Sequence, residues 1–104
     1  MDTLFRLEQT IRERREVDPG SSYVAQLRSR GPEVMARKFG EEALETVIAA
    51  LAGSRQEMVG EAADTLFHLI VLLAEKGVTL EEVIRELDRR SGVSGLEEKA
   101  NRSS

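Results

Sequence analysis

Two groups of acidic residues with helical spacing are the part of this sequence best suited to chemistry. The first group is Glu41, Glu42 and Glu45, and the second is Glu61 and Asp64. Residues three or four apart lie on one side of an α-helix, so each group holds its carboxylates together. Such a cluster is unfavourable unless something positive lies among the acids, and Mg²⁺ suits an all-oxygen ligand set. The pattern predicts a metal-dependent enzyme that acts on phosphates.

The alternative is that both acidic stripes are ordinary solvated helix faces, which is the usual meaning of such a pattern. Two features favour a site. Solvated stripes normally mix charges, because Glu–Lys pairs one turn apart stabilise a helix. The stripe from Glu57 through Glu61 and Asp64 to Glu75 has no Lys or Arg, although it includes His68. Both helices are otherwise apolar, so their acidic stripes can face each other across a groove.

Strand alternation is absent, and helix punctuation is frequent, which predicts an all-α fold of four to five helices. Ser54-Arg55-Gln56-Glu57 and Thr79-Leu80-Glu81-Glu82 each read as a capping box, the pattern that opens a helix. The expected helices run, in order, from about Thr3 to Glu16, roughly Tyr23 to Ser29, Pro32 to about Ala52, Arg55 to near Lys76, and Leu80 to about Arg90.

The two central helices are apolar over most of their circumference, so they need packing partners on several sides. The three shorter segments can hardly supply all of them. We therefore expect the Arg55–Lys76 helix to pack partly against a second subunit, in a helical bundle completed by homodimerisation.

The 104-residue chain fits one domain, expected over residues 1–90 with a flexible tail at 91–104. Its net charge of −4 argues against nucleic-acid binding. The absence of cysteine excludes disulfides and thiol chemistry and suits a reducing compartment. No signal peptide is visible, and the most apolar segment, Leu66–Ala74, is too short to span a membrane. We expect a cytoplasmic protein.

Three further residues lie near the acidic groups along the sequence. Lys38 precedes the first group by one turn and can contact either a phosphate or Glu42. Tyr23 follows a loop and can contact substrate or simply pack. The only histidine, His68, is expected to form a hydrogen bond to a carboxylate or a partner helix rather than to act in catalysis.

The sequence around these residues resembles the phosphoribosyl-ATP pyrophosphatases of histidine biosynthesis, within the all-α nucleotide pyrophosphohydrolases related to MazG. The resemblance extends from Leu4 to Arg90. It is carried by Ser22-Tyr23 with Leu27, by Arg37-Lys38-Phe39-Gly40-Glu41-Glu42-Ala43 with Glu45, and by Glu61-Ala62-Ala63-Asp64 with His68-Leu69 and Val71-Leu72-Leu73.

The resemblance implies hydrolysis of N1-(5-phosphoribosyl)-ATP to phosphoribosyl-AMP and pyrophosphate, by water attack at the α–β phosphate linkage. Some members of the family are fused to the cyclohydrolase of the next step, and the 104 residues of this chain leave no room for that domain, so we expect a free-standing enzyme. The resemblance also implies Mg²⁺ as cofactor, with Mn²⁺ as a possible substitute, held by four carboxylates: Glu42, Glu45, Glu61 and Asp64. Glu41 is then a candidate base or a support for the ligands, although a ligand carboxylate can also take the proton. Lys38 and Tyr23 are candidate substrate contacts.

Two other functions remain open at this stage. One is a related enzyme that removes non-standard nucleoside triphosphates from the nucleotide pool. The other is a dimeric helical interaction module without catalytic activity. The number of metal ions, the base and ribose contacts, assembly beyond a dimer and the sharing of sites between subunits are not determined by the sequence.

Overall fold

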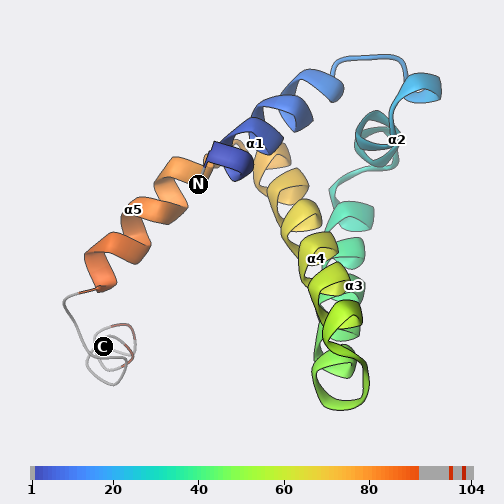
Figure 1. The fold of residues 1–104 in the computed structure, drawn as a ribbon. Coiled ribbons are helices and arrows are strands. Elements are labelled where there is room, and N and C mark those ends of the chain that lie inside the picture. Colours follow the sequence, from blue (N-terminus) through green and yellow to red (C-terminus); the bar gives the residue numbers. More distant parts are fainter. Residues whose placement is uncertain (1, 92–98, 100–101, 103–104) are drawn as a thin grey trace.

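The computed structural model describes residues 2–91, 99 and 102. In that part of the chain the secondary structure is entirely helical, which confirms the all-α prediction (Figure 1). The elements are α1 (Asp2–Arg14), the 3₁₀ turn η1 (Pro19–Ser21), α2 (Tyr23–Arg30), α3 (Pro32–Ala52), α4 (Arg55–Glu75) and α5 (Leu80–Arg90). The predicted flexible tail at 91–104 lies outside the described residues, except for positions 91, 99 and 102.

The starts of α4 and α5 are fixed by the two predicted capping boxes. The Ser54 side chain accepts a hydrogen bond from the Glu57 amide at 3.1 Å, and Glu57 accepts one from the Ser54 amide at 3.0 Å. Thr79 and Glu82 make the same reciprocal pair at 3.1 and 2.8 Å. Each box satisfies two amides that the first turn of a helix leaves without a partner. Both predicted helix starts are therefore confirmed.

The end of α1 differs from the prediction by two residues, since the helix stops at Arg14 rather than Glu16. The backbone tightens there, because the amides of Glu16 and Val17 bond three residues back, at 3.3 and 3.4 Å, rather than four. A separate contact joins this turn to a distant part of the chain. The Arg15 guanidinium donates to the Ala74 carbonyl and to the Glu75 carboxylate, each at 2.8 Å, at the end of α4. A cation there satisfies carbonyls that the last turn of α4 leaves free. This contact fixes α1 against α4.

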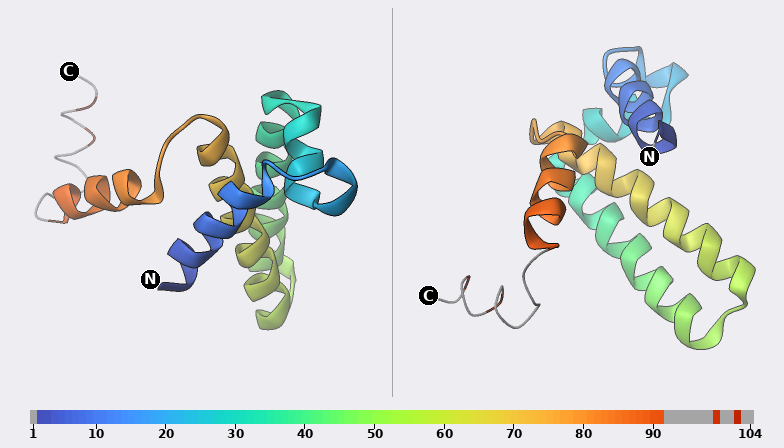
Figure 2. Two further views of the ribbon diagram at one scale, coloured as in Figure 1. Left: turned by 90° about the horizontal axis from the view of Figure 1, so that it is seen from above. Right: turned by 60° about the vertical axis from the view of Figure 1, so that its left-hand side comes forward.

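Helices α3 and α4 form a long antiparallel hairpin, joined through Gly53 and Ser54 (Figure 1). Helix α1 crosses the end of α4 that lies far from this connection, and α2 lies beside the start of α3 (Figure 2). Helix α5 continues away from the hairpin, and its first amide, that of Leu80, donates to the Glu8 carboxylate on α1 at 2.7 Å. The hairpin is thus the structural centre of the fold.

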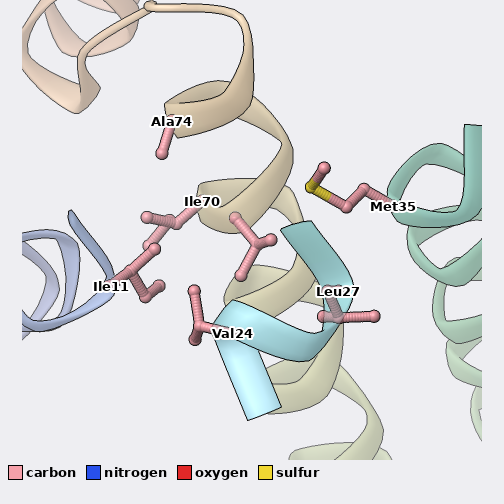
Figure 3. Packing of buried hydrophobic residues seen from close by; sticks show 7 residues of the cluster. Ile11, Val24, Leu27, Met35, Ile70 and Ala74 are labelled. Atoms are coloured by element: carbon pink, nitrogen blue, oxygen red, sulfur yellow. The ribbon is translucent and has the colours of Figure 1, made fainter. Parts of the chain in front are cut away.

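The hydrophobic core lies at the open end of the hairpin, where α1 and α2 meet α3 and α4 (Figure 3). Its buried members are Ile11, Val24, Leu27, Met35, Ile70, Val71 and Ala74. Burial of such side chains is the main stabilising contribution to folding. The other end of the hairpin has no third helix against it among the described residues (Figures 1 and 2).

Large apolar side chains are consequently exposed along that end of the hairpin. They are Leu44, Val47, Ile48 and Leu51 on α3, and Met58, Val59 and Leu66 on α4. Leu51 keeps 83% of its surface accessible. Among residues 2–91, 99 and 102, no helix combines the length and the apolar character needed to cross a lipid bilayer.

Candidate active site

Helices α3 and α4 bring three of the four predicted ligand carboxylates together in the middle of the hairpin. Glu42 and Glu45 extend from α3 and Glu61 from α4, and one carboxylate oxygen from each lies within 4.8 Å of the others. This arrangement follows from the helical repeat, since the acids occupy the face of each helix that meets the other helix. Three carboxylates at this separation can bind a single cation.

Asp64, the fourth predicted ligand, is not part of this tight group. It lies close enough for its charge to raise the pKa of both Glu42 and Glu61. Asp64 follows Glu61 by nearly one turn, so it faces the same side of α4. The four predicted ligands therefore form a core of three with a neighbouring fourth carboxylate.

Two oxygens of the cluster are buried without a hydrogen-bond partner among the described residues: Glu42 Oε2 and Glu61 Oε2. Leaving a buried polar atom unpaired costs roughly 1–3 kcal/mol, and more for a charged group. No donor in the described part of the chain reaches these two oxygens, and they belong to two of the three converging carboxylates. A divalent cation would satisfy both, so the residues present fit a metal ion with hard oxygen ligands.

The pKa shifts of the clustered carboxyl groups also indicate a site suited to a cation. Burial, followed by the charges of Glu45 and Asp64, raises the pKa of Glu42, and His68 opposes this shift. Burial, followed by the adjacent Glu45 carboxyl and then by the charge of Glu42, raises the pKa of Glu61. Both acids hold their protons more tightly than isolated glutamates do. A bound cation would remove this bias by favouring the ionised forms.

Sequence reasoning did not single out Thr46 and Thr65, which lie between the two helices at this level. Their hydroxyl oxygens are 2.7 Å apart, and both side chains are half-buried. Each threonine follows a predicted ligand, Glu42 or Glu61, by four residues, so it shares that ligand's helix face. This spacing is the sequence signal that identifies them.

His68 is buried and uses both ring nitrogens. Nδ1 lies 2.9 Å from the Asp64 carbonyl oxygen, and Nε2 lies 3.1 Å from the Tyr23 hydroxyl. A carbonyl can only accept, so Nδ1 carries a hydrogen, and in the neutral ring Nε2 accepts from Tyr23. The Tyr23 ring also stacks on Phe67, with centroids 6.2 Å apart. The bond to Tyr23 on α2 is the hydrogen bond to a partner helix that the sequence suggested, and no carboxylate bonds to His68 among the described contacts.

Lys38 lies one turn before Glu42, Glu41 directly precedes Glu42, and neither is part of the cluster. Lys38 Nζ is 3.8 Å from Glu41 Oε1, so the lysine pairs with Glu41 rather than with Glu42 as considered from the spacing. The Glu41 side chain is about half exposed, at 52%. A pair this accessible is weak and easily exchanged for another anion.

A shallow groove of about 230 Å³ runs from the cluster toward the hairpin connection. Glu45 and Glu61 border it, and its remaining lining is Ile48, Ala49, Ala52, Gly53 and Glu57. Pockets that enclose a whole small-molecule ligand typically measure about 300–1,000 Å³. The groove falls below this range.

Comparison with known proteins agrees with this arrangement. The phosphoribosyl-ATP pyrophosphohydrolase family matches residues 4–91. A phosphoribosyl-ATP pyrophosphatase from Erythrobacter litoralis is 63% identical over 102 residues, covering 98% of both chains. The protein of the same name from Rhizorhabdus wittichii is 61% identical over 100 residues, covering 96% of this chain and 94% of its own. The match includes both acid-bearing helices and nearly the whole chain, and this protein belongs to the phosphoribosyl-ATP pyrophosphohydrolase family.

Proposed function

We propose that the protein hydrolyses N1-(5-phosphoribosyl)-ATP to phosphoribosyl-AMP and pyrophosphate, the second step of histidine biosynthesis. Family membership and identities above 60% to proteins named for this activity support the reaction. The structural observation that carries the proposal is the convergence of Glu42, Glu45 and Glu61, two of which have a buried oxygen without a partner.

Mg²⁺ is the proposed cofactor, with Mn²⁺ as a substitute. Glu42, Glu45 and Glu61 would hold it, and Asp64 would complete the ligand set from the next turn of α4. When bound, the ion neutralises phosphate charge and makes an attacking water more acidic. The protein otherwise surrounds the polyphosphate with carboxylates that repel it, so catalysis depends on the cation.

The remaining residues have proposed roles in binding and proton transfer. Lys38 would exchange its exposed contact with Glu41 for a phosphate oxygen of the substrate. Glu41, freed from that pair and directly preceding the proposed ligand Glu42, is the proposed base that accepts a proton from water. Tyr23 would contact the substrate with the exposed part of its ring, 47% of the residue being accessible.

The active form is proposed to be a homodimer in the cytoplasm. The apolar surface of the hairpin, with Leu44, Val47, Ile48 and Leu51 all more than half exposed, is typical of a subunit interface rather than a free surface. Pairing two hairpins would give a helical bundle and bury this surface. It would also add a wall to the shallow groove beside Glu45 and Glu61.

The decisive experiment is a pyrophosphate-release assay on phosphoribosyl-ATP with and without Mg²⁺. We expect hydrolysis that depends on the metal and yields phosphoribosyl-AMP in a one-to-one ratio with pyrophosphate. A panel of canonical and non-standard nucleoside triphosphates serves as the comparison. Faster release from any member of that panel would assign the protein to nucleotide-pool cleansing instead. Absence of both hydrolysis and metal binding would leave only a role as an interaction module.

A further inference from the structure

Three of the four proposed ligand residues share a main-chain feature. The carbonyl oxygen of each lies 2.9 Å from a polar atom of the side chain four residues later. The pairs are Thr46 to Glu42, Thr65 to Glu61 and His68 to Asp64. A side chain that bonds back to the preceding turn in this way adjusts the local helix geometry. Polar side chains thus lie against the main chain of each turn that carries one of these three acids.

The two threonines also contact each other across the hairpin, through hydroxyl oxygens 2.7 Å apart. Two hydroxyls carry two hydrogens, but these side chains take part in three contacts. If Thr46 donates to Thr65, then Thr65 donates to the Glu61 carbonyl, and the reverse order satisfies Glu42. In either order one hydrogen bond spans α3 and α4, and the helices are joined next to the acidic cluster.

The acidic cluster opposes the close approach of α3 and α4, so a contact that holds the two helices together is needed beside it. Glu42, Glu45 and Glu61 carry like charges within 4.8 Å, and their repulsion pushes the two helices apart. The hydrophobic core lies toward the open end of the hairpin, around residues such as Met35 and Ile70, and does not include the cluster. No third helix supports the cluster among the described residues (Figure 2). The hydroxyl pair is a local contact that resists the separation.

We infer that Thr46 and Thr65 are positioning residues, whose hydroxyl contact sets the distance between the carboxylates of α3 and those of α4. The inference rests on the proposed function, since it assigns these residues to the same metal site. It predicts that loss of either hydroxyl weakens metal binding while the four carboxylates and the fold remain in place. Part of the free energy of Mg²⁺ binding would then be used to bring the carboxylates of the two helices to the distance that the ion requires.

The test uses Thr46→Val and Thr65→Val, which remove the hydroxyl at nearly constant shape, together with the double variant. Mg²⁺ binding is measured by calorimetry without substrate, and the Mg²⁺ concentration for half-maximal hydrolysis is measured separately. We expect both to weaken by about 10-fold, as for other residues that orient metal ligands. KM for phosphoribosyl-ATP at saturating Mg²⁺ should stay near the wild-type value. The double variant should match the single ones, because either change removes the same contact.

Three further variants separate positioning from stability. Thr46→Ser and Thr65→Ser keep the hydroxyl and should restore binding to within about 2-fold, the tolerance for a retained hydrogen bond. Thr10→Val, at an exposed site on α1, is the matched control and should behave as wild type. Thermal unfolding is recorded for each protein. If the valine variants do not fold, Thr46→Ala and Thr65→Ala supply a second hydroxyl-free pair.

Two results would overturn the inference. One is wild-type Mg²⁺ affinity in the folded valine or alanine variants. The other is weaker binding that serine does not restore, which would assign the effect to packing. The wild-type arm tests the proposed function itself. If the wild-type protein neither binds Mg²⁺ nor hydrolyses the substrate, the proposed function fails, whatever the threonine variants do.

Discussion

The hydroxyl oxygen of Tyr23 lies 3.1 Å from Nε2 of His68, which joins α2 to the turn of α4 that follows Asp64. The other ring nitrogen of His68 contacts the Asp64 carbonyl oxygen. A residue proposed to touch substrate is therefore linked, through one buried imidazole, to the backbone of a proposed metal ligand.

Tyr23→Phe should distinguish the contribution of the Tyr23 hydroxyl from that of its ring. The change leaves the stacking on Phe67 possible but deprives the buried His68 Nε2 of its partner. We expect a loss of about 1–3 kcal/mol in the free energy of unfolding, the range for a buried polar group left unpaired. Urea denaturation measures it. Tyr23→Leu also removes the aromatic ring and should raise KM further than Tyr23→Phe does. Equal KM values for the two variants would contradict a substrate contact through the ring.

Glu42→Gln and Asp64→Asn should each keep the fold and remove most of the hydrolytic activity. Each removes one negative charge from the proposed ligand set at constant side-chain size. We expect losses well above about 10-fold, the lower end of what changes around metal ligands cause. Calorimetry with Mg²⁺ should show matching losses of affinity. Glu33→Gln, in the first turn of α3, is the control and should retain activity. Wild-type turnover in either variant would exclude that carboxylate as an essential ligand.

The stability of the metal-free protein should carry a pH signature of Glu42. Its pKa is raised in the folded state, so the native protein retains a proton that the unfolded chain has released. Stability from this group therefore falls as the pH rises past 4.5, the ordinary value for glutamate. Glu42→Gln cannot lose a proton, so its stability relative to wild type should increase over the same range. Thermal unfolding in EDTA at several pH values measures the difference.

Without metal at neutral pH, Glu42→Gln should gain stability relative to the wild type, and saturating Mg²⁺ should make the wild type the more stable protein. The wild-type protein binds the ion through Glu42 and gains stability by mass action, whereas Glu42→Gln binds it more weakly. If the difference in stability between the two proteins changes with neither pH nor Mg²⁺, Glu42 is not part of a cluster of mutually repelling carboxylates that binds the ion.

Leu51→Glu should prevent self-association. Leu51 is 83% exposed on the apolar surface of the hairpin, and a charge there would be buried in the proposed interface at a large desolvation cost. Sedimentation equilibrium should show a dimer for the wild type and a monomer for this variant. Val17→Glu changes another partly exposed apolar residue, in the turn after α1, and should remain dimeric. A monomeric wild type at micromolar concentration would rule out the proposed assembly.

The sequence predicted α3, α4 and α5 closely because their boundaries depend on local chemistry. Pro32 at the first turn of α3 and the capping boxes at Ser54 and Thr79 act through residues at most three positions away. The end of α1 was predicted two residues too late, because the switch at Glu16 to bonds three residues back has no signal in the sequence. The contact between Arg15 and the end of α4 was not predicted either, since no local pattern reports an interaction between residues so far apart in sequence.

The residues of the candidate site could be predicted from the sequence, but their distances and contacts could not. Helical spacing placed the acids on facing stripes, and three of them do meet. The position of Asp64 beside this group, and the contacts of Thr46 with Thr65 and of Tyr23 with His68, depend on how the helices cross. Crossing angle and axial offset are set by the packing of many side chains together. A single sequence therefore leaves them open.

The short connection at Gly53 and Ser54 has a consequence for how the molecule assembles. The entropy lost on closing a chain segment grows with the logarithm of its length, and the segment between Glu45 and Glu61 is much shorter than the one between α1 and α4. Contacts between residues near in sequence also form faster than distant ones. The two halves of the acidic cluster are thus within reach of each other early in folding, before the N-terminal helix finds its place against the hairpin.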